Sequence, residues 1–240
     1  MTVYRYRKGD IELRLGDYRD VLADVEPDAV ITDPPYGART HRGNERMGRF
    51  ERSDLSYAAW TAGDIALLVE RYAAVDGWLF CMTSDDLTGV YRDVYSEAGR
   101  YDFAPVPILQ HRPRLQGDGP GSCAVYGMPA RPRARAFMSW GSLPGWYLAG
   151  TDRDGHIGGK PLSLMRRIVR DYSRPGDIVC DPCSGGATTL IAAAMEGRRA
   201  IGAELDPATF ELACKRIERT PITPPLFIDD APKAVQGDLL

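Results

Sequence analysis

The chain has 240 residues, of which 44% are hydrophobic and 26% charged, and its net charge is −3. That length suits one large domain or two small ones, and the acidic balance argues against a protein that coats nucleic acid through bulk charge. No apolar run approaches the ~18 residues of a membrane span, the first twenty residues lack a secretory apolar segment, and the five cysteines form no disulfide framework, so we expect a cytoplasmic chain without membrane association.

Short apolar runs alternate with amphipathic segments through the first half of the chain. The pattern predicts strands at 11–15, 29–32 and 77–82 and helices at 18–23, 57–74 and 87–98. Residues 38–56 are polar and aperiodic, which indicates a loop. Beyond them, 101–109 is predicted to be extended, 111–135 is rich in Gly, Pro and Arg, and short strands are predicted at 122–126 and 136–140.

The C-terminal third shows the clearest pattern. Pro161 is predicted to open a helix as a first-turn proline, and Asp206 is predicted to cap another. Strands at 178–180 and 199–203 flank a helix at 188–196, and residues 221–240 are expected to be an extended tail. Strands that alternate with helices of this length indicate an α/β fold with a mostly parallel sheet.

Acidic residues follow four of the predicted strands, namely Asp17, Asp33, Asp181 and Glu204. Ligands of parallel sheets bind beyond the carboxyl ends of the strands, so these four side chains are expected to surround one site. Each acid alone is more simply explained as a turn former or helix cap. The set of four, with two Gly/Pro motifs among them, favours a site.

The first of these motifs is Asp33-Pro34-Pro35-Tyr36. A carboxylate and a rigid backbone carbonyl can both accept hydrogen bonds from one –NH2 group, and an aromatic ring can stack on a planar base. The exocyclic amine of adenine or cytosine is a poor nucleophile until such acceptors hold its hydrogens. The alternative is a simple surface turn.

The second motif runs from Cys180 to Thr189 and joins a strand to a helix through Gly185 and Gly186. Its glycines allow close approach of a ligand, and the acid Glu204 follows about twenty residues later, as in folds that bind ribose hydroxyls. A nucleoside cofactor therefore fits. Cys180 and Cys183 have the CxxC spacing of zinc ligands. No second cysteine pair or histidine cluster completes such a site, so we expect no metal.

At this point the sequence resembles the β-group DNA amino methyltransferases, which make N6-methyladenine or N4-methylcytosine. The resemblance rests on the motif at Asp33, on His156 with Lys160-Pro161, on 181–189, on 201–204 and on Gly16-Asp17. The catalytic motif precedes the cofactor motif, which is the order that defines this group. The match covers residues 10–37 and 156–219, whereas 38–155 match only in general character.

The resemblance implies a circularly permuted, Rossmann-like sheet of about seven strands with one antiparallel strand. It implies a catalytic domain at 1–220, with a short target-recognition segment at 111–155, and S-adenosyl-L-methionine as cofactor. Catalytic roles would fall to Asp33, Pro34, Pro35 and Tyr36. Cofactor contacts would come from Gly16, Asp17, Lys160, Pro161, Asp181, Pro182, Cys183, Ser184, Gly185, Thr188, Glu204 and Leu205.

Double-stranded DNA is then the expected partner, and dimers are common in the family. Two arginine-rich stretches are candidates for phosphate contacts, although each is also what a solvated loop looks like. They contribute Arg39, Arg42, Arg46 and Arg49, followed by Arg52, and then Arg112, Arg114, Arg131 and Arg133, flanked by His111 and Arg135. Trp140, Trp146 and Tyr147 are expected to pack rather than to stack on bases.

Three departures from the family pattern matter. Cys183 stands where the family has Phe, Ala187 where it commonly has Gly, and the recognition segment is short. The Asp at position 33 favours adenine N6 over cytosine N4. The alternatives are N4-cytosine methylation, methylation of RNA or of a protein amide, an inactive nucleic-acid-binding protein of the same fold, and a dinucleotide oxidoreductase, which the missing GxGxxG disfavours.

Overall fold

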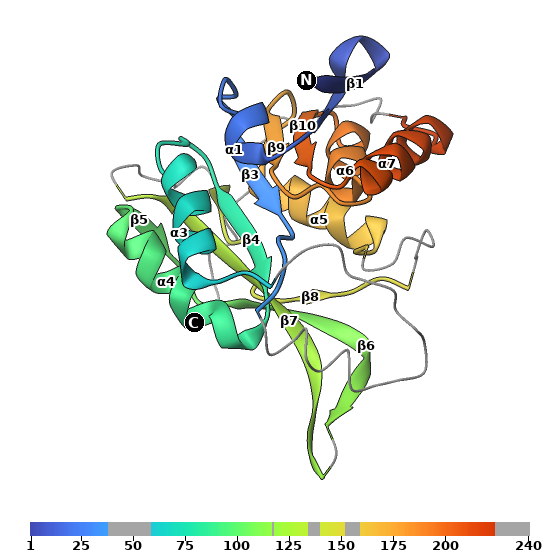
Figure 1. Ribbon diagram of the computed structural model, residues 1–240. Helices are drawn as coiled ribbons and strands as arrows, with labels where there is room; N and C mark the ends of the chain where they lie inside the picture. Colours follow the sequence, from blue (N-terminus) through green and yellow to red (C-terminus); the bar gives the residue numbers. More distant parts are fainter. Residues whose placement is uncertain (38–58, 117, 134–139, 152–158, 224–240) are drawn as a thin grey trace.

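The computed structural model describes residues 1–37, 59–116, 118–133, 140–151 and 159–223. In these residues a single mixed sheet has helices on both faces (Figure 1). The sheet order is β1-β2-β10-β9-β3-β4-β7-β6-β8, and β5 pairs with β7. The strands are β1 (Thr2–Tyr6), β2 (Ile11–Leu15), β3 (Ala29–Thr32), β4 (Leu79–Thr83), β5 (Arg100–Asp102), β6 (Val106–Gln116), β7 (Gly119–Pro132), β8 (Tyr147–Leu148), β9 (Ile178–Asp181) and β10 (Arg199–Glu204).

Five neighbouring strands form the parallel centre of this sheet. β2, β10, β9, β3 and β4 all pair in parallel with their neighbours. β7 runs antiparallel to β4, and β1 runs antiparallel to β2. The expected α/β fold with a mostly parallel sheet is confirmed. The permuted order is visible in the centre, where β9 and β10 from the end of the chain lie between β2 and β3 from its beginning.

Helices cover both faces because buried strand residues alternate between two hydrophobic clusters. In β4, Phe80 and Met82 pack on one face, whereas Leu79 and Cys81 pack on the other. The first cluster lies under α5 (Leu162–Tyr172), α6 (Thr188–Met195) and α7 (Pro207–Arg219). The second lies under α1 (Tyr18–Val21), α3 (Ala62–Arg71) and α4 (Thr88–Glu97). Short 3-10 turns, η1 (Arg7–Gly9) and η2 (Asp85–Leu87), complete the described elements.

The predicted strands at 11–15 and 29–32 are confirmed at the same bounds, and the other helices and strands of the centre are confirmed within a few residues. Three features of the sheet were not predicted. β1 adds an antiparallel edge, β8 adds a two-residue edge strand beside β6, and the sheet has ten strands rather than seven. Pro161 precedes α5 as its N-cap and does not lie in its first turn.

The largest difference concerns residues 106–132, which form a long hairpin of β6 and β7, whereas the sequence predicted extended structure only at 101–109 and 122–126 within this part of the chain. It extends away from the body of the molecule (Figure 1). Pro107, Pro129 and Pro132 lie within these strands, and prolines normally indicate a strand end, which is why the sequence pattern hid the hairpin. The register shifts between Leu109 and Arg114, as at a bulge. The predicted strand at 136–140 lies almost wholly outside the described residues, as do residues 38–58 and the tail beyond 223.

Candidate active site

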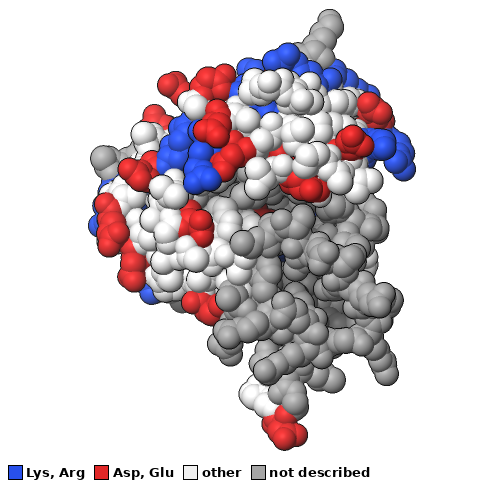
Figure 2. All heavy atoms as spheres, in the orientation of Figure 1, with Lys and Arg blue, Asp and Glu red and all other residues white. Residues whose placement is uncertain are grey.

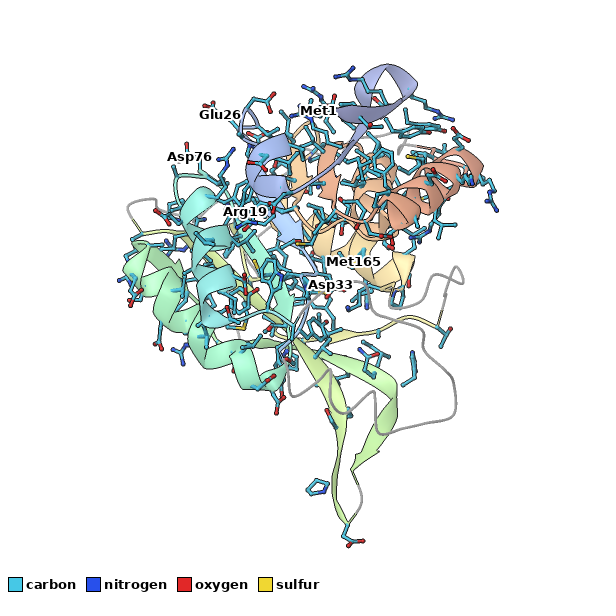
Figure 3. The ribbon with its side chains drawn as sticks, viewed as in Figure 1. Met1, Arg19, Glu26, Asp33, Asp76 and Met165 are labelled. Carbon is cyan, nitrogen blue, oxygen red and sulfur yellow. The ribbon has the colours of Figure 1, made fainter. Side chains whose placement is uncertain are left out.

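The carboxyl ends of β2, β10, β9 and β3 meet at one edge of the sheet. Glu204 ends β10 opposite Leu15 of β2, Asp181 ends β9 opposite Gly202, and Asp33 directly follows β3. Figure 3 shows Asp33 at the end of β3, beside α5. The four acids expected at one rim are therefore neighbours in the structure, and the packing of parallel strands is what brings them together.

Asp33 and Tyr36 form a compact pair. The Tyr36 hydroxyl donates to Asp33 Oδ1 at 2.9 Å, and the Lys160 ammonium donates to Asp33 Oδ2. The Lys160 nitrogen also lies 5.0 Å from the centre of the Tyr36 ring. The two prolines end the strand, and Pro34 is buried. The Tyr36 carbonyl accepts from the Trp60 N–H at 3.3 Å, which ties the motif to the segment before α3.

Asp181 forms hydrogen bonds both to the strand that precedes the first motif and to the loop of the second. Its Oδ1 accepts from the Thr32 hydroxyl at 2.7 Å and from the Cys183 N–H at 3.1 Å. Burial raises the pKa of Asp181 to about 6, and the charge of Asp33 contributes in the same direction. A buried carboxylate with this pKa is ionised at neutral pH at a cost in stability, and a cationic ligand beside it would offset that cost.

The loop after Asp181 packs tightly against β10. The Ser184 hydroxyl donates to the Asp181 carbonyl at 2.9 Å, and the Ser184 N–H donates to the Ala203 carbonyl at 2.9 Å. A Cβ at Gly202 would lie 2.1 Å from Ser184 Oγ and 2.8 Å from the Asp181 carbonyl oxygen, so only glycine allows this approach. Gly202 is thus required by the shape of the loop.

α6 begins at this loop with a residue in a strained conformation. Ala187 has φ 60°, in the left-handed region, and its side chain is fully buried in the core. Arg216 of α7 donates to the Gly186 carbonyl and, at 2.7 Å, to the Thr188 hydroxyl. Ala187, where the family resemblance predicts glycine, therefore has a glycine-like backbone conformation in this chain, and Arg216 holds the turn from outside.

Glu204 and Asp17 lie at the other side of the loop. Glu204 accepts from the Asp206 N–H at 2.8 Å, and burial raises its pKa. The next residue, Leu205, is 65% exposed, although it is a large apolar side chain. Asp17 caps α1, and its hydrogen bonds with Arg19 lower its pKa. The helix-cap interpretation therefore applies to Asp17 whether or not it also contacts a ligand.

The two cysteines of the CxxC spacing separate. Cys180 of β9 is buried on the face of the sheet that α1, α3 and α4 cover, and its sulfur lies 3.6 Å from the Tyr72 hydroxyl. Cys183 lies in the loop after β9. Burial raises the pKa of the Cys183 thiol well above its usual value, and nearby Asp181 and Glu204 act in the same direction. Across the described ranges, no group of three His, Cys, Asp or Glu side chains is placed to hold a metal ion.

Among the predicted DNA-binding arginines, only Arg131 and Arg133 have described side chains, and these two do not lie at the site. Arg131 and Arg133 lie at the opposite end of the sheet, where Arg131 stacks 4.6 Å from the centre of the Tyr101 ring and Arg133 donates to the Arg100 carbonyl. Arg112 and Arg114 belong to β6, and nothing is described of their side chains. Arg39, Arg42, Arg46, Arg49, Arg52, Arg135 and His156 lie outside the described residues. On the described part of the face in Figure 2, basic and acidic side chains are intermixed.

The three aromatic residues near the end of the recognition segment differ in how they pack. Trp140 packs edge-on against Trp78 with ring centres 5.9 Å apart, and Tyr147 is buried, as expected. The expectation of packing is wrong for Trp146, which is 58% exposed. Its exposure follows from its place just before the short edge strand β8, which packs only its alternate residues inward.

Three residues that support the site were not found from the sequence. Thr32 donates to Asp181, Gly202 admits the loop, and Arg216 holds the turn before α6. Thr32 had one available signal, because it is a polar residue at the buried end of a strand that immediately precedes a motif. Arg216 had none, since its contact spans 28 or 30 residues and depends on helix packing.

Comparison with known proteins identifies the C-terminal block. Residues 135–215 match the family model for DNA methylase, N6_N4_Mtase, which confirms the resemblance drawn from the motifs. The DNA adenine methyltransferase YhdJ of Escherichia coli (strain K12) is 37% identical over 65 residues, which cover 27% of this chain and 22% of that protein. The chain spans about a quarter of the length of the curated relatives it matches.

Solved structures match over most of the chain. A putative DNA modification methylase from Thermus thermophilus, complexed with S-adenosyl-L-methionine, has a TM-score of 0.62 and 26% identity, covering 86% of this chain and 93% of its own. The PvuII DNA methyltransferase (cytosine-N4-specific) has a TM-score of 0.62 at 15% identity, covering 89% and 88%, and shows the shared fold alone. No helix in the described part of the chain is both long and apolar enough to cross a bilayer.

Proposed function

We propose, for a chain whose residues 135–215 match the DNA methylase family, that it is a methyltransferase that transfers a methyl group from S-adenosyl-L-methionine to the exocyclic amine of a flipped DNA base, with adenine N6 favoured. The observation that carries this is the juxtaposition of two motifs. Thr32, which precedes Asp33, hydrogen-bonds to Asp181, so the amine-binding carboxylate and the cofactor loop lie on adjacent strands.

The residues present fit this cofactor. S-Adenosyl-L-methionine is a cation with a ribose diol, and it supplies an activated methyl group when bound. Asp181 is a buried carboxylate at a polar rim, which suits a cationic group. Glu204 is a second carboxylate with capacity for ribose hydroxyls. The approach of the Ser184 loop to Gly202 shapes a backbone cradle between them, and the exposed Leu205 supplies an apolar surface for a purine.

Asp33 performs the central step at the target amine. Its carboxylate accepts a hydrogen bond from the amine, and the Pro34 carbonyl accepts the other, so the nitrogen becomes tetrahedral and its lone pair is freed. Methyl transfer would form the nitrogen–carbon bond as the carbon–sulfur bond of the donor breaks and the thioether leaves, and the nitrogen would lose one proton, which Asp33 can accept. Tyr36 holds the base by stacking after it has left the duplex. Positioning supplies most of the rate in such a site.

The proposal also covers the choice of target base, the recognition of DNA and the oligomeric state. Adenine is favoured because Asp begins the motif, and the relative named above is an adenine enzyme. The hairpin of β6 and β7 overlaps the first part of the recognition segment expected at 111–155. We propose that it contacts DNA, because a two-stranded ribbon fits the major groove. A homodimer and a cytoplasmic location complete it, and light scattering of the purified protein tests the dimer.

The test is transfer of radiolabelled methyl from S-adenosyl-L-methionine to mixed DNA, followed by nucleoside mass spectrometry. Asp33→Ala is expected to abolish transfer, whereas Asp93→Ala, which removes an exposed aspartate on α4, is expected to leave it unchanged. Labelled N6-methyladenine supports the proposal in full, and labelled N4-methylcytosine corrects the base. No transfer to DNA despite measurable cofactor binding would overturn the DNA substrate and favour RNA or protein.

A further inference from the structure

Lys160 contacts both residues that the proposed reaction assigns to the target base. Its ammonium donates to Asp33 Oδ2 and lies over the Tyr36 ring, 5.0 Å from the ring centre. The other carboxylate oxygen, Asp33 Oδ1, accepts from the Tyr36 hydroxyl at 2.9 Å. Both oxygens of Asp33 are therefore engaged by donors from the protein itself. The Lys160 side chain is 15% exposed and that of Asp33 is 23% exposed, so water competes only in part.

The sequence motif alone assigned Lys160 to the cofactor side of the site. The contacts place it on the base side, because its described polar partner is Asp33 and not Asp181 or Glu204. Lys160 follows the recognition segment and lies two residues before α5, and it reaches Asp33 across 127 positions in sequence. This contact therefore exists only in the folded chain.

An ammonium group resembles the amine during methyl transfer. Both are tetrahedral nitrogens that carry positive charge and donate N–H hydrogen bonds, and both suit a carboxylate beside an aromatic face. A base that stacks on Tyr36 and donates to Asp33 needs the acceptor and the ring face that Lys160 holds in this structure. The lysine and the target amine therefore compete for one position.

We propose that Lys160 is a positioning residue that stands in for the target amine. It holds Asp33 and Tyr36 in their reactive arrangement while the base is absent, and its ammonium leaves Asp33 when the base arrives. The proposal rests on the proposed function, because it takes Asp33 and Tyr36 to be the base-binding residues. The ion pair lowers the affinity for the base in exchange for an ordered site, so Lys160 sets the KM for DNA more than kcat.

Three variants measured at saturating S-adenosyl-L-methionine test this. Lys160→Met removes the competing charge at similar length and is expected to lower the KM for DNA about fivefold, with kcat within about twofold of wild type. Lys160→Arg forms a stronger, bidentate pair with a carboxylate and is expected to raise the KM by a similar factor, about fivefold. Lys215→Met removes an exposed lysine on α7 and is the matched control, expected to change neither constant.

The opposite order of KM values overturns the proposal. If Lys160 contacts DNA phosphate instead, the Met variant raises the KM and the Arg variant resembles wild type. A fall in kcat at unchanged KM assigns Lys160 to the chemical step and also overturns the proposal, as does behaviour of both variants like the Lys215 control.

A double-mutant cycle separates failure of this proposal from failure of the proposed function. Thermal unfolding of Asp33→Asn, Lys160→Met and the double variant needs no substrate. The double variant is expected to lose less stability than the two single variants add up to, because either change alone breaks the same contact. Additive losses overturn the stand-in role. If the cycle shows coupling between Asp33 and Lys160 but the protein does not methylate DNA, the contact is established. The proposed function, which assigned Asp33 to a DNA base, is then overturned.

Discussion

At the scale of single residues, Asp181 shows how the site differs from an ordinary protein interior. It is 1% exposed, yet its hydrogen-bond partners in the described residues are threonine hydroxyls and a backbone N–H, with no cationic side chain among them. Burial without a compensating charge raises its pKa to about 6. Such an arrangement costs stability in the protein alone, and the proposed cationic cofactor would offset that cost.

Asp181→Asn is expected to change how stability depends on pH. A raised folded-state pKa contributes stability below the ordinary value of 3.8 that is lost as pH rises through about 6. The neutral amide has no such loss, so above pH 6 the variant gains about 2 kcal/mol relative to wild type, compared with pH 4. Urea unfolding of both proteins across this range measures the difference. A difference that is constant with pH contradicts the buried, uncompensated carboxyl.

At the level of elements, α7 supports the loop between β9 and α6, although β10 separates that loop from α7 in the chain. Arg216 donates to the Gly186 carbonyl and the Thr188 hydroxyl, across the turn in which Ala187 has its left-handed conformation. Ala187 costs about 1–2 kcal/mol in that conformation. The helix therefore stabilises a strained turn that shapes the cofactor side of the site.

Arg216→Met is expected to weaken binding of S-adenosyl-L-methionine about tenfold, because the turn relaxes when its external donor is lost. Isothermal titration calorimetry measures this without catalysis. Arg219→Met, an exposed residue of the same helix, is the matched control and is expected to bind like wild type. Equal affinity of both variants for the cofactor would show that Arg216 contributes only to folding.

At the scale of the whole molecule, the chain divides into a compact sheet that carries the site and a hairpin that extends from it (Figure 1). The net charge is −3, and charges of both signs are mixed on the described part of the face in Figure 2. Bulk attraction to DNA is thus weak, so we propose that the affinity for DNA comes from local segments such as the hairpin.

Shortening the hairpin tests this division. Leu109 and Ala124 are register partners, so replacing residues 110–123 with Asn-Gly retains the pairing with β8 and closes a two-residue turn. Cofactor affinity is expected to stay within about twofold of wild type, whereas the KM for DNA rises by more than about tenfold. Unchanged methyl transfer to DNA would place recognition elsewhere.

The centre of the fold and the two motifs could be predicted from local sequence patterns. The local signals are the alternation in β2, the β-branched run of β3, the proline break after it and the cap at Asp206. The structure confirms the elements they predict. The four acids at strand ends also followed from the sequence, because parallel strands leave only one edge for their carboxyl ends.

The contacts of those acids could not be predicted, because they depend on how distant segments pack. The pairing of Lys160 with Asp33, the bond from Thr32 to Asp181 and the support from Arg216 join residues 127, 149 and up to 30 positions apart. The edge strands β1 and β8 and the hairpin were likewise not predicted. Pairing with a neighbouring strand can stabilise an extended segment even where prolines or a short length make it a poor strand by sequence. Contacts between distant segments carry no local periodicity, and that is why the chemistry of Lys160 emerged only from the folded chain.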